Sequence, residues 1–139
     1  MRILIFHGYL LRGTGSNIYN ANLARALARL GHEVHLFCQD RMAVPPTGVT
    51  IHVPDIGRLL PVYVADHYEG FDALPFPEIN EMELSHYLDA NIAAIRSVPS
   101  PEIALANHLV MGPVILARGV CTENLIRVDG VAESPKLAE

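Results

Sequence analysis

Short apolar runs alternate with longer segments of helical periodicity along this chain, and that alternation constrains its fold more than any other feature. Runs of strand length occupy residues 1–6, 33–37, 49–53, 102–106 and 124–128. Between them, apolar side chains recur at helical spacing over residues 16–30 and about 80–97, and a third helix is expected at 113–119. Parallel strands need a crossover between them and are apolar throughout when both faces are covered. The sequence therefore predicts an α/β protein with a Rossmann-like open parallel sheet and helices on both faces.

The two longer helices carry start and stop signals. Ser16 or Asn17 is expected as the N-cap of the first, and Gly31 as its left-handed C-terminal residue. Its expected apolar stripe is Ile18, Leu23, Leu27 and Leu30. The stripe of the second helix is Leu84, Leu88, Ile92 and Ile95, which stops before Pro99. By contrast, the many prolines and aromatics of residues 54–78 favour a long ordered excursion over a regular element.

Composition limits the number of domains and the classes of partner. With 139 residues, half of them apolar, the chain suits one domain over residues 1–131, followed by a polar tail over residues 132–139. A net charge of −5 without a basic cluster argues against nucleic-acid binding. No stretch is long and apolar enough for a transmembrane helix or a secretory signal, so we expect a cytoplasmic protein. The histidines show no metal-ligand spacing, and no metal or cofactor is expected.

A glycine pair, Gly13-Thr14-Gly15, lies between the first strand and the first helix, where open parallel sheets bind their ligands. The N–H groups of Ser16, Asn17 and Ile18 at the helix start would face an anion such as a pyrophosphate. Ile18 stands where a dinucleotide fingerprint needs its third glycine, and no lysine follows as in a Walker loop. A plain turn without a ligand is the alternative.

Several phrases of the sequence carry a family resemblance. They are "MRILIF", "LARLGHEVHLF", "PVYVADHYEGFDALPFPEINEMELSHYLDANIAAIRSV" and "EIALANHLVMGPVILAR", in this order within residues 1 to about 118. Together they resemble the amino-terminal half of a family 4 glycosyltransferase of GT-B architecture. The resemblance implies an acceptor-side domain of an enzyme that moves a hexose from a nucleotide sugar to a hydroxyl acceptor. It also implies that Gly13, Thr14 and Gly15, with Ser16 and Asn17, lie against phosphate or acceptor.

Further candidates follow from the same expected edge of the sheet. Asn107 and His108 come directly after a strand, and they could contact an acceptor hydroxyl, although His108 could equally cap a helix. The family tends to show His-Gly where Asp129-Gly130 stands here. Asp129 and His108 are therefore weak candidates for a general base, and the catalytic residue remains unknown. A turn aspartate is the alternative for Asp129.

Two other groups of residues lie at or above this edge. His7 ends the first strand and is a candidate for lining the site. The segment from Asp66 to Glu69, which includes His67 and Tyr68, could shape an acceptor pocket or form an ordinary solvated loop.

Members of the family continue into a second domain that binds the donor, whereas this sequence ends at Glu139. We therefore expect negligible sugar transfer by this chain alone. We also expect self-association, or association with a carboxyl-terminal GT-B half, through apolar surface left uncovered. The residues expected to be shared are His7, Leu10, Leu11, Phe71, Leu74 and Phe76. The alternative function is a non-catalytic binding or partner-subunit module with the same fold.

Overall fold

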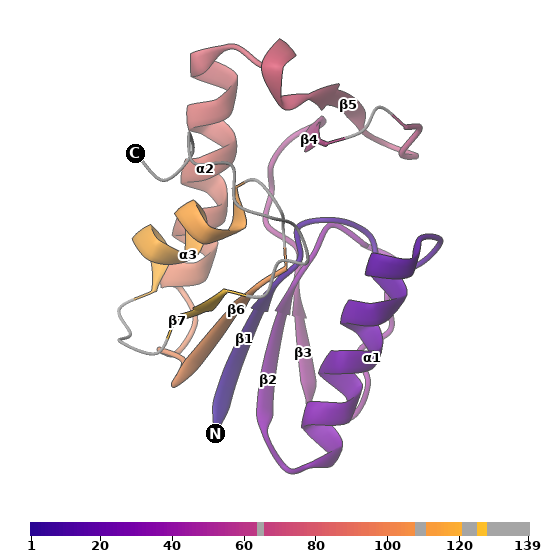
Figure 1. The fold of residues 1–139 in the computed structure, drawn as a ribbon, viewed down its shortest axis with the longest axis vertical. Coiled ribbons are helices and arrows are strands. Elements are labelled where there is room, and N and C mark those ends of the chain that lie inside the picture. Colours follow the sequence, from indigo (N-terminus) through magenta and orange to yellow (C-terminus); the bar gives the residue numbers. More distant parts are fainter. Residues whose placement is uncertain (64–65, 108–110, 121–124, 128–139) are drawn as a thin grey trace.

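The computed structural model describes residues 1–63, 66–107, 111–120 and 125–127. Its main element is a five-stranded sheet of order β3-β2-β1-β6-β7 (Figure 1). The strands are β1 (Arg2–Phe6), β2 (Glu33–Phe37), β3 (Val49–His52), β6 (Ile103–Ala106) and β7 (Leu125–Arg127). All neighbouring pairs are parallel. The predicted α/β class and parallel sheet are confirmed.

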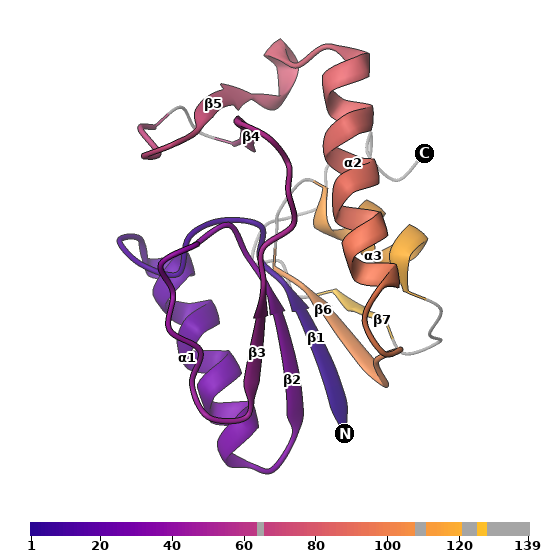
Figure 2. The same cartoon turned by 180° about the vertical axis from the view of Figure 1, so that it is seen from behind.

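Helices cover the two faces of this sheet, as predicted. α1 (Gly15–Arg29) lies on one face, while α2 (Glu81–Arg96) and α3 (Gly112–Gly119) lie on the other (Figures 1 and 2). Side chains alternate between the faces along each strand, so β1 contributes to both cores. Ile3 and Ile5 pack in the cluster that includes Leu23 and Leu27 of α1. Leu4 and Phe6 pack in the cluster formed with α2 and α3.

The helix predicted over about residues 80–97 from its apolar stripe agrees closely with α2. Asn80 is its N-cap, and a capping box joins the Asn80 side chain to the Glu83 backbone N–H at 2.8 Å and the Glu83 carboxylate to the Asn80 N–H at 3.1 Å. Ile92 and Ile95 of the predicted stripe are buried, and its remaining members, Leu84 and Leu88, pack against the same core.

The prediction for α1 needs two corrections. The N-cap is Thr14, so the helix begins earlier than a cap at Ser16 or Asn17 would allow. Moreover, Ile18 is 48% and Leu30 is 74% exposed, so neither belongs to the buried face. Asn17, Asn20 and Ala24 are buried instead, because both asparagine side chains hydrogen-bond to residues at the end of β1 or in the loop that follows it.

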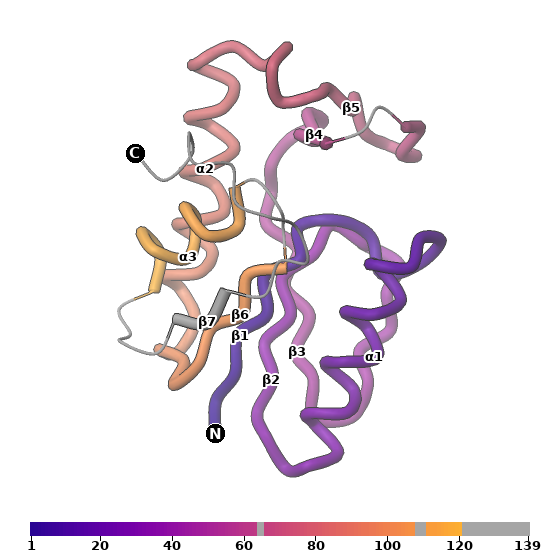
Figure 3. The backbone as a smooth tube through the Cα atoms, in the orientation of Figure 1, coloured from indigo at the N-terminus to yellow at the C-terminus, as the bar shows by residue number. Residues whose placement is uncertain are grey.

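Residues 54–78 contain regular secondary structure, contrary to the prediction of a long excursion without it. β4 (Leu59–Val62) and β5 (Asp72–Pro75) form a two-stranded parallel sheet, followed by a 3₁₀ helix, η1 (Phe76–Glu78). We call residues 59–63 and 66–78 the β4–β5 lobe; it lies beyond the carboxyl ends of the main strands (Figures 1 and 3). Proline lacks an N–H donor but keeps its carbonyl, so Pro61 is tolerated in a sheet that has only edge strands.

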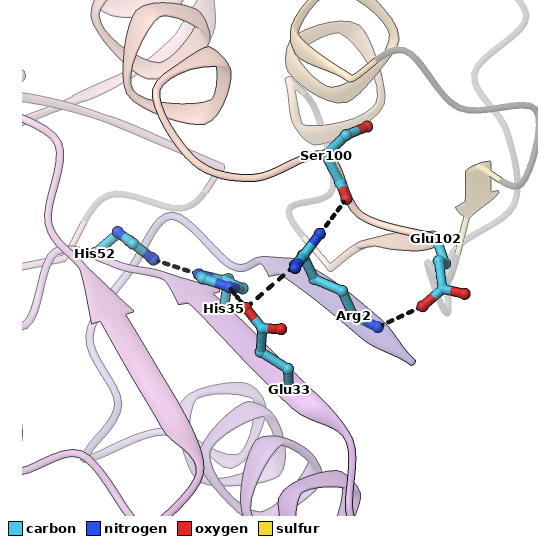
Figure 4. A network of polar contacts seen from close by, with 6 residues as sticks. All are labelled: Arg2, Glu33, His35, His52, Ser100 and Glu102. Carbon is cyan, nitrogen blue, oxygen red and sulfur yellow. Dashed lines mark hydrogen bonds and ion pairs between the residues drawn. The ribbon is translucent and has the colours of Figure 1, made fainter.

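A polar network crosses the main sheet from the amino-terminal ends of β1 and β2 to the last residue of β3, on the face opposite α1 (Figure 4). Arg2 Nε donates to Glu33 Oε1 at 3.1 Å, and Glu33 Oε1 lies 2.9 Å from His35 Nε2. His35 Nδ1 lies 2.8 Å from His52 Nε2, and the two rings stack with centroids 5.1 Å apart. The Glu33 carboxylate therefore links β1 to β2, and the two histidines link β2 to β3.

Two glycines with positive φ allow a matched prediction about packing. Gly31 follows α1 at φ +91° in open space, whereas Gly48 has φ +83° and an added Cβ would lie 3.2 Å from Ala28 Cβ. Gly31→Ala should cost about 1 kcal/mol of unfolding free energy through backbone strain alone. Gly48→Ala should cost about 1 kcal/mol more because Ala28 must also shift. Urea unfolding of both variants measures the difference, and equal losses would contradict the contact.

Candidate functional site

The candidate site lies where the order of the main sheet reverses. The chain leaves β1 in one direction and β6 in the other, and ligands of open α/β sheets bind at the carboxyl ends of such neighbouring strands. The N–H of Asn107 donates to the Phe6 carbonyl at 2.9 Å, and the N–H of His7 donates to the Phe37 carbonyl at 3.0 Å. The residues after β1 and β6 are thereby held at one edge, beside the end of β2.

His7 is the centre of a hydrogen-bond network at this edge. Its side chain is buried, with Nε2 2.8 Å from Asn17 Oδ1 and 3.0 Å from the Leu10 carbonyl. On the other side of the ring, Nδ1 lies 3.1 Å from Asn20 Nδ2. Asn20 Oδ1 in turn accepts from Asn107 Nδ2 at 2.7 Å. The network joins β1, α1 and the end of β6.

These partners determine the protonation of His7. Asn17 Oδ1 and the Leu10 carbonyl can only accept, so Nε2 carries the hydrogen, while Nδ1 accepts from the Asn20 amide. Burial lowers the pKa of His7, and its hydrogen bonds with Asn17, Leu10 and Asn107 raise it by less. His7 is therefore neutral at pH 7, and it orients the loop rather than exchanging protons with a ligand.

The glycine loop ends in open donor groups. Gly13 has φ +92°, which favours glycine, and a Cβ on Gly15 would meet open space. Among the described residues, no hydrogen bond reaches the N–H groups of Gly15, Ser16 and Asn17, and the helix has no side-chain cap. The predicted contribution of Ile18 is wrong, because its N–H donates to the Thr14 carbonyl at 3.1 Å within the helix. The donors thus begin one residue earlier than predicted.

The Asn17 and Asn107 side chains stand beside these donors but are already engaged. Asn17 Nδ2 donates to the Arg12 carbonyl at 2.6 Å. The backbone N–H of Asn17 is therefore the donor of this residue that has no partner among the described residues. Asn107 is half-buried and directs its amide to Asn20. The other two candidates, His108 and Asp129, lie outside the described residues.

The β4–β5 lobe is joined to the glycine loop by aromatic stacking. Tyr68 stacks on Tyr9 with ring centroids 6.2 Å apart, and Tyr9 makes an edge contact with His7 at 5.7 Å. Asp66, His67 and Glu69, near Tyr68 in the sequence, are exposed. The predicted acceptor-pocket segment therefore reaches the edge of the sheet through its tyrosine.

Sequence reasoning missed two residues of this edge. Asn20 links His7 to Asn107, and its signal is a second asparagine three residues after Asn17 on the same face of an alanine-rich helix. Gln39 is buried after β2, with its Nε2 donating to the Pro54 carbonyl at 2.9 Å. Its Oε1 has no partner among the described residues, and nothing in the local sequence indicates this.

The surface predicted for self-association needs one correction. His7 is buried within its network and cannot contribute to an interface. Leu11 packs against the core beneath α1, and Phe71 and Phe76 pack against the core on the other face, all three partly buried.

Within the described ranges, no group of three or more His, Cys, Asp or Glu side chains could hold a metal ion. In the same ranges, no helix is both long enough and apolar enough to cross a bilayer. No family model, curated protein or solved structure matches the chain.

Proposed function

We propose that this chain forms the acceptor-side, Rossmann-like domain of a GT-B glycosyltransferase that moves a hexose from a nucleotide sugar to a hydroxyl. The observation that carries the proposal is the row of N–H groups at Gly15, Ser16 and Asn17, which have no hydrogen-bond partner within the part of the chain that the structure describes. They lie at the start of α1, which follows the central strand of a parallel sheet. This is the position at which α/β proteins bind phosphates.

The chemistry of hexose transfer needs such donors. The leaving group is a nucleoside diphosphate, whose negative charge increases as the bond to the sugar breaks. Fixed N–H groups and the positive end of a helix dipole stabilise that charge without reorganising during the reaction. The His7 network supports this role, because it fixes the loop to β1 and α1 through Leu10 and Asn17.

The acceptor side of the proposal rests on the neighbouring aromatics. Tyr9 and Tyr68 bring the β4–β5 lobe to the same edge, where their rings could orient a sugar or another flat acceptor. His108 and Asp129, which follow β6 and β7 in the sequence, are the two alternative candidates for the general base.

A non-catalytic binding module is the second candidate, and the state of His7 favours it. Both ring nitrogens of this edge histidine are hydrogen-bonded inside the protein, which leaves it no role as a base. The same loop could then bind an anion without any transfer step.

A titration of the loop tests the phosphate site that the proposal requires. Uridine diphosphate and inorganic pyrophosphate should shift the amide NMR signals of Gly15, Ser16 and Asn17. Gly15→Val places an isopropyl group in the open space before these donors, so affinity should fall by about tenfold or more.

Ala26→Val is the matched control, because it adds the same branched side chain at an exposed position of α1. Its affinity should equal that of the unmodified chain. An unchanged affinity in the folded Gly15→Val variant would refute the site. Binding of diphosphate without transfer, in the presence of donor and acceptor and a carboxyl-terminal GT-B half, would favour the binding module.

A further inference from the structure

A cavity of about 250 Å³ lies on the α1 face of the sheet, away from the reversal of strand order. It is open to solvent and is bordered by α1, by the loop between β1 and α1, and by the connection between β2 and β3. Leu36 and Ile51 contribute to its lining from the strands, and Ala21 does so from α1. Ligand sites are concave and mostly apolar, and the volume suits a small ligand.

The connection between β2 and β3 brings exposed apolar side chains to this cavity. Met42 is 75% and Val44 is 86% exposed, and both line it. Both stand beside a floor that is itself apolar. An exposed apolar rim around an apolar floor is a property of binding sites.

Two arginines add positive charge to the same cavity. Arg12 Nε lies 3.8 Å from Asp40 Oδ2, and the Asp40 carboxylate also accepts from the N–H groups of Leu11 at 3.3 Å and Met42 at 3.1 Å. Arg25 forms no ion pair among the described residues and contacts only Asn22 Oδ1, at 3.3 Å. The buried Asp40 thus offsets Arg12, and Arg25 is left as an uncompensated cation in a chain of net charge −5.

We propose that this cavity binds a small amphiphilic anion, an apolar body carrying one phosphate or carboxylate group. The apolar body would lie against Ala21 and Ile51, and the anionic group would bind Arg25, whose guanidinium can hold two oxygens at once. This site is separate from the donors of Gly15–Asn17, and it does not depend on the proposed glycosyltransferase function.

The test titrates the full chain with 1-naphthyl phosphate by isothermal titration calorimetry. We expect saturable binding to the full chain, at least about tenfold tighter than that of 1-naphthol or inorganic phosphate, since each lacks half of the recognition. Ala21→Leu should abolish binding by filling the cavity. Arg25→Gln should weaken it about fivefold to tenfold.

Arg29→Gln and Ala26→Leu are the matched controls, because both positions are exposed on α1 and neither lines the cavity. Both should bind as the unmodified chain does. Gly15→Val should also leave this binding unchanged, which distinguishes the cavity from the diphosphate site. Equal affinities for the Ala21→Leu, Arg25→Gln and unmodified chains would overturn the proposal. So would concentration-dependent self-association that Val44→Ser abolishes, because a second copy would then cover the rim.

Discussion

Replacing His7 with alanine should lower the free energy of unfolding by about 3 kcal/mol, the largest effect expected of any single substitution at this edge. The buried ring would leave a cavity, and Asn17 Oδ1 would lose its donor. A buried acceptor without a partner costs about 1 to 3 kcal/mol. Asn20 Nδ2 limits the loss, because it also donates to the Ser16 carbonyl at 2.9 Å. Urea unfolding at pH 7.5 measures the change.

Two further variants separate the network from a general effect of removing a histidine. His67 is exposed, so His67→Ala should change stability by less than about 0.5 kcal/mol. His7→Gln keeps a donor that can reach toward Asn17, and it should recover about half of the loss. If His7→Ala costs no more than His67→Ala, the network does not stabilise the fold. If His7→Gln is as destabilising as His7→Ala, the hydrogen bond is not the reason.

The parts of the fold that the sequence predicts well are those in which one local signal decides the outcome. The apolar stripe that ends at Ile95, shortly before Pro99, predicts both the extent of α2 and its buried face. The strands follow from short apolar runs in the same way. Propensity, periodicity and tertiary packing agree in these elements, so reading the sequence alone is enough.

The errors occur where tertiary contacts override the local signal. Ile18 and Leu30 have helical spacing, yet both are exposed, whereas Asn17 and Asn20 are buried. Asn17 hydrogen-bonds to the loop after β1. Asn20 hydrogen-bonds to His7 at the end of β1 and to Asn107 after β6. The β4–β5 pair is missed because prolines usually exclude a strand, and only its pairing partner makes Pro61 acceptable.

The candidate site divides in a similar way between what local sequence indicates and what it does not. Glycines before a helix indicate the loop at Gly13–Gly15, since both the need for positive φ and the open donors are local properties. The protonation of His7 depends on Asn20, and the charge of the α1-face cavity depends on the pairing of Asp40 with Arg12. Such pairings follow from the packed structure alone.

The contacts of His35 and His52 make the fold sensitive to acid. Glu33 Oε1 accepts from His35 Nε2, so the His35–His52 bond can hold one hydrogen between Nδ1 and Nε2. The two histidines can share one positive charge. A second positive charge would place hydrogens on both nitrogens that face each other, His35 Nδ1 and His52 Nε2. Burial and the charge of His35 lower the pKa of His52, and its hydrogen bonds with His35 and Arg2 lower the pKa of Glu33. Arg2, which is paired with Glu33, adds a further positive charge to this network. Phe37 stacks on His52 and is uncharged.

Stability should therefore fall steadily as the pH drops below the ordinary histidine value of 6.5. A lowered pKa in the folded state means that the unfolded chain takes up the proton first, so acid favours unfolding over the window from 6.5 down to the folded pKa. His52 and the buried His7 each contribute a slope of at most about 1.4 kcal/mol per pH unit.

Urea unfolding between pH 7.5 and 5.5 measures the combined slope. His52→Gln keeps a polar partner for His35 but cannot titrate, so it should remove the share of His52, whereas His67→Gln at an exposed position should leave the slope unchanged. A His52→Gln chain that loses stability as steeply as the unmodified one would show that the paired histidines do not carry this acid sensitivity.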